Sequence, residues 1–299
     1  MNEKKLKDHL SALDREGVTL YIFKEGILLY RSVRSGIAPL IEAVDAHKQE
    51  EDLVKQIRIG RLRYPYVSGQ AWRRWWREVL YEDFGWTPSE VTREAKSAYT
   101  KGDPIKFEED DLFGYMAARK RDKGKGGGTY RRVSPLKNSL LISVIPNVIE
   151  RDFGHFSRNL PPDADIIPFE SEHYTTYLQG VFTISLTDVG RFEVGEMKDI
   201  PADMVKEHGG ELIEVDGSFR LSLDERVRRV REVLLALERL RYGAHLARNL
   251  SDVAPVVVLL GFLDGGNAPL QRLFNPDVNQ ERVMLNLERL RSVLADYKD

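Results

Sequence analysis

The stretch from Tyr64 to Glu78 constrains the fold most, because it holds three of the chain's four tryptophans and three arginines. Pro65 favours extended backbone just before it, and Ser68 is a good helix N-cap, so a helix is predicted to begin at Gly69. The three tryptophans recur at spacings of three and four, which places them on one helical face. They are Trp72, Trp75 and Trp76. We expect this face to anchor the hydrophobic core.

The same region carries an unbroken positive charge. From Lys55 to Arg77 there are seven basic residues and no acidic one. A helix start offers free backbone N–H groups and a partial positive charge, which suit a phosphate. The sequence therefore predicts an anion-binding surface, and the polar and basic residues assigned to it are Arg58, Arg61, Arg63, Ser68, Gly69, Gln70, Arg73, Arg74 and Arg77.

The overall composition limits what this surface can be. The net charge of the 299-residue chain is only −2, so a polyanion site must be a local patch. There are no cysteines, and the six histidines show no metal-binding spacing, so we expect no metal and no cofactor. No apolar run has the length of a membrane span and no signal peptide is visible, so we expect a cytoplasmic protein that does not contact membranes.

Two further segments have the composition of an RNA-binding surface. The first is basic and glycine-rich, which favours a flexible loop that orders on a phosphate backbone; its candidates are Lys120, Arg121, Lys123, Lys125, Arg131 and Arg132. The second mixes aromatic and basic residues just before the polar, proline-rich excursion Asn159 to Pro168. Its candidates for stacking on bases and contacting phosphates are Arg151, Phe153, His155, Phe156 and Arg158.

The predicted elements indicate an α+β protein. Strands are predicted over Val18 to Tyr30, Leu140 to Ile145, Tyr174 to Leu186 and Ala254 to Phe262, and helices begin at Gly69 and at Leu223. In the second helix, the arginines are expected off the apolar face, and they are Arg226, Arg228, Arg229 and Arg231. A last helix is predicted over Asn279 to Tyr297. The order strand, helix, strand, strand, helix, strand is that of a ferredoxin-like or RNA-recognition-motif fold.

Four motifs in this order resemble a known family. They are Tyr64-Pro65-Tyr66-Val67-Ser68-Gly69-Gln70-Ala71-Trp72-Arg73-Arg74-Trp75-Trp76-Arg77-Glu78, Asp110-Asp111-Leu112-Phe113-Gly114-Tyr115-Met116, Arg132-Val133-Ser134-Pro135-Leu136 and Arg151-Asp152-Phe153-Gly154. The chain resembles the DevR-type CRISPR-associated proteins over roughly residues 55 to 265. These are Cas-seven members of the RAMP superfamily and form the backbone of type I-B Cascade. In the loop after the first strand, Ile37 to Gln49 departs from the glycine- and asparagine-rich pattern of the family.

The resemblance implies a hand-shaped single domain over residues 1–299. An RNA-recognition-motif palm would carry a finger-like insertion at 81–132 and a thumb-like insertion at 147–173. Copies would stack along one CRISPR guide RNA without catalysing a reaction, as part of an antiviral surveillance complex. The implied partners are the guide RNA, other copies, subunits of the Cas-five, Cas-six and large-subunit types, and target DNA through the guide.

Two other functions remain open from the residues. A metal-independent endoribonuclease of the same superfamily would use His155, His173 or Tyr174 as general acid or base. Asp45 is the one aspartate near the place where related subunits carry a cleaving aspartate. A developmental regulator, the role behind the DevR name, would have to read DNA, and no helix-turn-helix signal favours that.

Overall fold

The computed structural model describes eleven stretches, which are residues 34–35, 51–52, 54–94, 97–119, 128–156, 158–161, 167–243, 251–263, 268–277, 279 and 282–297. Several predictions lie outside the described residues. They are the strand over Val18 to Tyr30, Asp45, and the loop residues Lys120, Arg121, Lys123 and Lys125. The side chain of Phe156 also lies outside the description.

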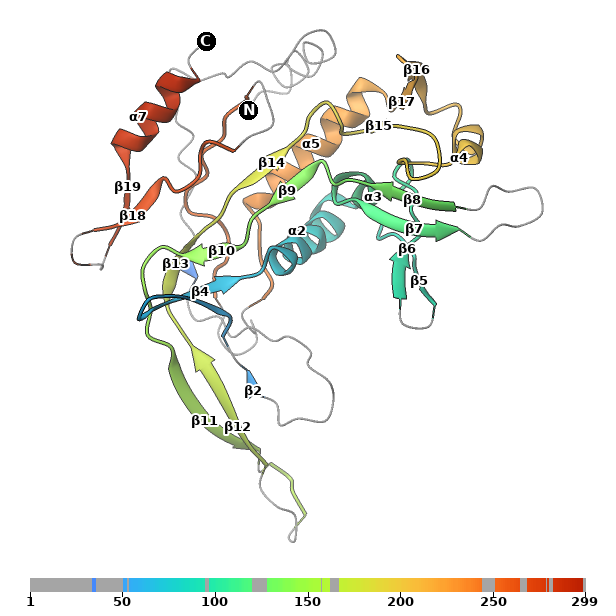
Figure 1. Ribbon diagram of the computed structural model, residues 1–299. Helices are drawn as coiled ribbons and strands as arrows, with labels where there is room; N and C mark the ends of the chain where they lie inside the picture. Colours follow the sequence, from blue (N-terminus) through green and yellow to red (C-terminus); the bar gives the residue numbers. More distant parts are fainter. Residues whose placement is uncertain are drawn as a thin grey trace.

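A five-stranded antiparallel sheet, which we call the central sheet, lies between helix α2 and the projecting β11–β12 hairpin (Figure 1). Its strands, in spatial order, are β1 (Arg34–Ser35), β13 (Thr176–Gln179), β10 (Leu141–Ser143), β4 (Leu62–Val67) and β3 (Gln56–Ile59). Side chains alternate between the two faces of a strand. Val67 of β4 and Leu178 of β13 point into the core on one face, at 1% and 7% exposure. The other face of the sheet is only half-buried.

The tryptophan helix is confirmed. Helix α2 (Gly69–Phe84) begins after Ser68, whose side-chain oxygen accepts from the Ala71 N–H, and it ends at Gly85 in the left-handed region. All three tryptophans are buried. Trp76 donates from Nε1 to the Val233 carbonyl at 2.8 Å, which ties α2 to the second long helix, α5 (Leu223–Leu237). The core therefore lies between the two helices and one face of the central sheet.

The region predicted as a finger forms two hairpins and a short helix. They are β5 (Val91–Glu94) with β6 (Ser97–Thr100), α3 (Glu108–Leu112), and β7 (Tyr115–Arg119) with β8 (Gly128–Arg132). Figure 1 shows both hairpins on the side of the molecule away from β11 and β12. The name finger stays a prediction.

The region predicted as a thumb contains a long antiparallel hairpin. Strands β11 (Glu150–Phe156) and β12 (Ile167–His173) pair over their full length, and β2 (Glu51–Asp52) runs parallel to β12. In Figure 1 this hairpin projects away from the rest of the molecule. Its shape agrees with a thumb, while its function stays a prediction.

The remaining elements are small sheets and short helices. They are β9 (Leu136–Asn138) with β14 (Phe182–Ile184), the sheet of β15 (Arg191–Phe192), β17 (Ser218–Arg220) and β16 (Ile213–Val215), helix α4 (Ala202–Glu207), the pair β18 (Phe274–Pro276) and β19 (Val283–Leu285), and helix α7 (Leu287–Asp296).

Two predicted elements are wrong in part. The closing helix starts late, because Val283 lies in β19 and Asn286 caps α7 by accepting from the Arg289 N–H. Residues 254–262 form no regular strand. Pro255 lacks a backbone N–H, and no described strand pairs with this segment, so its apolar side chains pack half-buried in an irregular path.

The positions of two α5 arginines also contradict the prediction. Arg226 and Arg229 are 1% and 2% exposed, although charged residues were expected off the apolar face. Arg226 donates to the carbonyls of Val189 and Leu186, and Arg229 to those of Pro104 and Ile105. Buried carbonyls with free lone pairs compensate these cations, and sequence periodicity does not reveal them. The mixed α+β class is confirmed, and the RNA-recognition-motif arrangement of the palm stays a prediction.

Candidate nucleic-acid interface

The first part of the candidate interface is the basic turn, which we define as Arg58, Arg61 and Arg63. Strands β3 and β4 form a tight hairpin in which Gly60 adopts a left-handed φ of 63°. Arg58 lies directly opposite Arg63 in the register, and Arg61 stands in the turn itself. All three are exposed, and no ion pair with a described acidic residue is found for any of them. Like charges this close favour a bound anion.

The second part is one face of the β11–β12 hairpin. Alternation places Arg151, Phe153 and His155 on the same face, about 7 Å apart along the strand. Phe153 is 75% exposed, and His155 is exposed beside it. This face therefore offers a cation, an aromatic ring and an imidazole in a row.

Arg151 does not offer a free charge. Its Nη1 lies 3.1 Å from Glu170 Oε1 and its Nε lies 3.3 Å from Glu172 Oε1, while the side chain stays 57% exposed. Glu172 in turn accepts from the Val54 N–H at 2.9 Å. The guanidinium is held in place, and it can still present its outer edge to a phosphate.

The opposite hairpin face explains the glycine of the fourth motif. Gly154 pairs with Phe169, and a Cβ atom at residue 154 would lie 2.3 Å from the Phe169 ring. The ring therefore rests on the glycine backbone. Phe169 covers a place where a strand without a side chain would otherwise be weak.

The basic turn lies beside the root of the hairpin. Asn147, which leads into β11, donates its N–H to the Arg63 carbonyl at 2.9 Å and its side-chain amide to Thr175 at 2.6 Å. Figure 1 shows the β3–β4 turn next to the point where β11 and β12 leave the body. The basic turn therefore adjoins the root of the hairpin.

Arg73 is not part of this surface. Its guanidinium donates to the Leu136 carbonyl at 2.7 Å, the Phe113 carbonyl at 2.8 Å, and the side chains of Asn138 and Ser134. Burial, with Arg77 as a second cause, lowers the pKa of Arg73 to about 10, so it remains charged at neutral pH. Arg73 is half-buried, and its donors are used by groups of the chain itself.

Arg132 is buried, at 4% exposure. Its guanidinium pairs with Asp111 and donates to the carbonyls of Asp188 and Arg191. Asp111 is fully buried and also accepts from Arg229 at 2.9 Å. The two arginines hold this carboxylate between the β7–β8 hairpin and α5.

These contacts give the first three motifs a shared structural role. Arg73 of the first motif bonds Phe113 of the second and Ser134 of the third, and Arg132 of the third pairs with Asp111 of the second. The motifs therefore fasten the region 81–132 to the α2 helix. Sequence reasoning missed this role, because most of the acceptors are backbone carbonyls that no residue type marks.

The remaining candidates on α2 and nearby lie at or near the surface. Ser68 and Gly69 are half-buried at the helix start, where Gly69 accepts from the Asn138 side chain, and Gln70 is exposed. Arg74 is 75% exposed and 3.5 Å from Glu78, whereas Arg77 is half-buried near Glu109. The two other candidates with described side chains, Arg131 and Arg158, are exposed.

The candidate general acids and bases, His155 and His173, do not lie close together. His155 lies opposite Pro168 and His173 opposite Glu150, so about 16 Å of strand separates them and their side chains point to opposite faces. Burial raises the pKa of Tyr174 well above its usual range, which keeps it neutral. No group of three acidic or histidine side chains suited to a metal gathers within the described residues.

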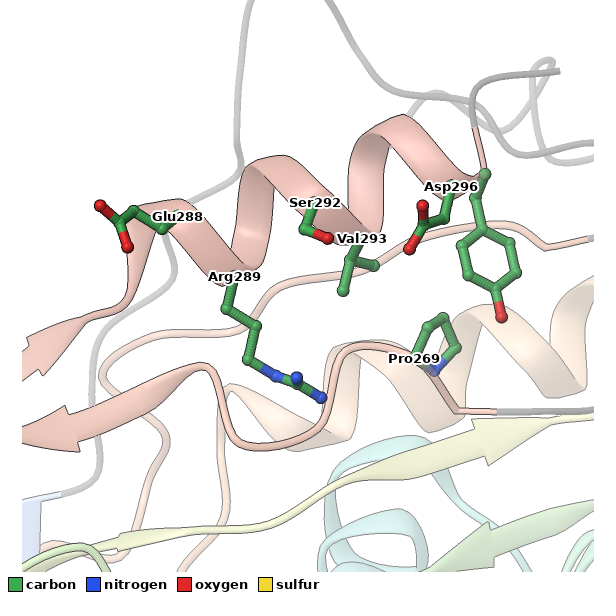
Figure 2. Close-up of a pocket in the computed structure, with 7 residues that line it drawn as sticks. Pro269, Glu288, Arg289, Ser292, Val293 and Asp296 are labelled. Carbon is green, nitrogen blue, oxygen red and sulfur yellow. The ribbon is translucent and has the colours of Figure 1, made fainter.

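A separate pocket of about 500 Å³ lies beside α7. Figure 2 shows Arg289, Ser292 and Asp296 extending from the helix toward Pro269. It shares no residue with the basic turn or the hairpin. Among the described helices, none combines the length and the apolar character that crossing a bilayer requires.

The sequence profile of the family described as "CRISPR-associated negative auto-regulator DevR/Csa2" matches residues 52–270. This is most of the chain. The chain belongs to this family. No curated protein matches it.

Solved structures of CRISPR complexes resemble the chain at low identity. One chain, from a structure described as "CRISPR RNA-guided surveillance complex", is 13% identical with a TM-score of 0.44, over 90% of this chain and 80% of its own. Another, described as "CRISPR RNA-guided surveillance complex, pre-nicking", is 11% identical with a TM-score of 0.45, over 89% and 86%. Because both TM-scores lie below 0.5, we take the function from the family and the surface geometry alone.

Proposed function

We propose that this member of the DevR/Csa2 family is a guide-RNA-binding backbone subunit of a type I CRISPR surveillance complex, with several copies along one RNA. One observation carries the proposal: an exposed basic turn, Arg58, Arg61 and Arg63, adjoins the root of a projecting hairpin that exposes Phe153 and His155. Cations beside an exposed ring suit a single-stranded nucleic acid.

The recognition is independent of sequence. Arginines that contact phosphates fix the position of a strand without reading its bases, and a ring can stack on any base. A subunit that holds guide RNAs of many sequences requires this kind of contact. The proposed partners are the guide RNA, other copies, subunits of the Cas-five, Cas-six and large-subunit types, and target DNA paired with the guide, in a cytoplasmic type I-B complex.

The proposed role is non-catalytic. The separation of His155 from His173 along the hairpin supports this, because general acid–base cleavage needs both groups near one phosphate. Labelled RNA should stay intact after incubation with the protein in EDTA or in magnesium. RNA cleavage that disappears in His155→Ala would show that the subunit is an endoribonuclease.

Co-expression with a CRISPR array and the neighbouring genes tests the proposal directly. Copurified RNA of one uniform length that carries spacer sequence is expected. RNA of random length, or none, would contradict the proposal.

The basic turn can be tested with a charge-reversal variant. Arg58, Arg61 and Arg63 changed together to glutamate should weaken binding to all RNA sequences alike and flatten the salt dependence by about one unit of slope per lost contact. The matched control reverses three exposed arginines elsewhere in the chain, Arg231, Arg282 and Arg291. An equal loss in both variants would mean that only net charge matters.

The description of the family favours a second function, negative autoregulation. A regulator of this kind would bind the duplex promoter of its own gene. Preference for that duplex over single-stranded RNA of equal length would support regulation over the backbone role.

A further inference from the structure

Helix α7 turns one row of side chains toward the pocket beside it. Residues at spacings of three and four lie on one side of a helix. Figure 2 shows this row facing Pro269 across a space of about 500 Å³. The row consists of Arg289, Ser292, Val293 and Asp296. We call the space between this row and Pro269 the α7 groove.

The α7 groove holds two charges of opposite sign. Both Arg289 and Asp296 are exposed, and neither forms an ion pair with a described residue. Arg289 donates from Nε to the Gln271 carbonyl at 3.0 Å, which fixes the guanidinium at one end of the groove. Seven helical residues place Asp296 about 10.5 Å further along the axis. At this distance the two side chains do not neutralise each other.

Both charges also oppose the dipole of helix α7. The helix runs from Leu287 to Asp296, so Arg289 lies in its first turn and Asp296 in its last. A helix dipole favours acidic side chains near the N-terminus and basic ones near the C-terminus, and these two positions carry the reverse. The charges therefore do not serve the helix. A ligand with a carboxylate at Arg289 and a cation at Asp296 would follow the dipole and compensate both.

We propose that the α7 groove binds an extended peptide segment of a partner protein, with an acidic side chain against Arg289 and a basic side chain against Asp296. In a polyproline II segment, side chains three residues apart lie on one side, about 9.3 Å from each other. This spacing matches the two charges of the groove. Pro269 and the ring of Tyr297 add the apolar walls on which such segments dock.

Other classes of ligand fit the α7 groove less well. A phosphate backbone would be attracted by Arg289 but repelled by Asp296 and by Glu288, which also lines the groove. A free amino acid carries its carboxylate and ammonium on one carbon atom, so it does not reach both charges. An apolar surface would bury both charges without partners. A peptide of mixed charge leaves neither charge uncompensated.

The α7 groove lies at the edge of the part of the chain that the family profile matches. The match ends at residue 270, whereas β18, β19 and α7 follow it. The inference therefore goes beyond the proposed function and does not depend on RNA binding. A protein that fails to bind RNA can still bind the peptide, so the two failures are distinguishable.

The experiment titrates the full chain with eight-residue peptides that are acetylated and amidated at their ends. Each peptide is built from alanine and proline and carries two charged residues three positions apart. The charged pairs are glutamate with lysine in both orders, two lysines, and two glutamates. A peptide with adjacent glutamate and lysine controls for spacing. Fluorescence anisotropy measures affinity, and NMR spectra of the ¹⁵N-labelled protein locate the binding site.

The wild type should prefer a peptide with glutamate and lysine three positions apart. Each mismatched charge should weaken binding about fivefold, the scale of one exposed ion pair. Chemical-shift changes should appear at the amide groups of Ser292 and Val293. These measurements need no variant, so they decide the question even if a variant fails to fold.

Two substitutions should change the preferred peptide. Arg289→Glu leaves two acidic side chains in the groove, so this variant should prefer the peptide with two lysines. Asp296→Lys should prefer the peptide with two glutamates. It keeps the bond from Arg289 to Gln271 and agrees with the helix dipole, so its melting temperature should not fall. The control Arg291→Glu, on the opposite side of the helix, should keep the wild-type preference.

Three outcomes would overturn the inference. Equal affinity for all peptides would show that the groove does not read charge. A change of preference in Arg291→Glu as large as in Arg289→Glu would mean that only net charge matters. Self-association of the wild type that Asp296→Lys abolishes, without peptide binding, would assign the groove to a second copy.

Discussion

At the scale of single residues, several arginines of this protein bond to the chain itself rather than standing free at the surface. The guanidinium groups of Arg73, Arg132 and Arg229 donate hydrogen bonds to carbonyls or side chains of the chain itself. A guanidinium presents five N–H donors in a fixed plane, so it can join segments that are distant in sequence. Charge in the sequence therefore does not identify the residues that contact a ligand.

The role of Arg73 predicts a large effect on stability. Arg73→Ala leaves two carbonyls and two side chains without their donor, and it should lower the free energy of unfolding by about 3 kcal/mol. Urea denaturation measures the loss. Arg74→Ala is the control, since Arg74 is 75% exposed and its loss should change stability by less than about 0.5 kcal/mol. Equal effects of the two substitutions would refute the structural role of Arg73.

Asp110 predicts a pH effect of known sign. Burial raises its pKa, although it accepts from the Ser89 hydroxyl and the Asp103 N–H. A raised pKa means that the folded state holds the proton more tightly, so this group adds stability as the pH falls through the folded-state pKa toward about 3.9, the unfolded value. The stability of the wild type relative to Asp110→Asn should therefore rise on acidification. A difference that is flat from pH 7 to pH 4 would show that Asp110 is not perturbed.

At the scale of elements, the sequence predicts what local periodicity controls. Helix α2 follows from Ser68 and the spacing of the tryptophans, because both signals act within a few residues. The structural role of Arg73 does not follow, since Leu136 and Phe113 approach it only in the folded chain. Residues 254–262 were predicted as a strand because their apolar character is a local property of the sequence. Whether another strand pairs with them depends on distant residues, so the local sequence does not show it.

The sequence predicted where the projecting segment lies in the chain, but not which side chains of the β11–β12 hairpin share a face. The polar excursion marked its place, yet only the register shows that Phe153 lies on one face and Phe169 on the other. This division separates the exposed ring of Phe153 from the ring that covers Gly154.

The contact between Gly154 and Phe169 can be tested by a double-mutant cycle. Gly154→Ala should displace the Phe169 ring and cost about 1 kcal/mol, because the new Cβ occupies the ring's position. The same substitution in a Phe169→Ala background should cost almost nothing. Amide hydrogen exchange at Ser171 and His173 reports the local stability of the hairpin. Equal costs in both backgrounds would mean that the ring does not rest on the glycine.

At the scale of the whole molecule, the candidate RNA-binding groups and the first three motifs lie in different parts of the protein. The basic turn and the hairpin lie together, whereas the first three motifs fasten the region 81–132 on the other side of α2 (Figure 1). A copy that binds RNA at one end and projects a hairpin beyond its own body can meet the next copy on the same strand. Such a contact is heterologous, so it repeats along a filament instead of closing into a dimer.

Shortening the hairpin tests this assembly. Phe156 and Ile167 are cross-strand partners, so residues 157–166 can be replaced by a two-residue Asn-Gly turn without changing the register. The change removes the tip and leaves the core intact, so the melting temperature of the free protein should stay within a few degrees. On guide RNA, however, the shortened protein should no longer form regular arrays, and electron microscopy measures this. A control insertion of Gly-Ser in the β16–β17 turn, after Gly217, should leave the arrays unchanged. Arrays of normal length and spacing from the shortened protein would show that neighbouring copies do not meet through the hairpin tip.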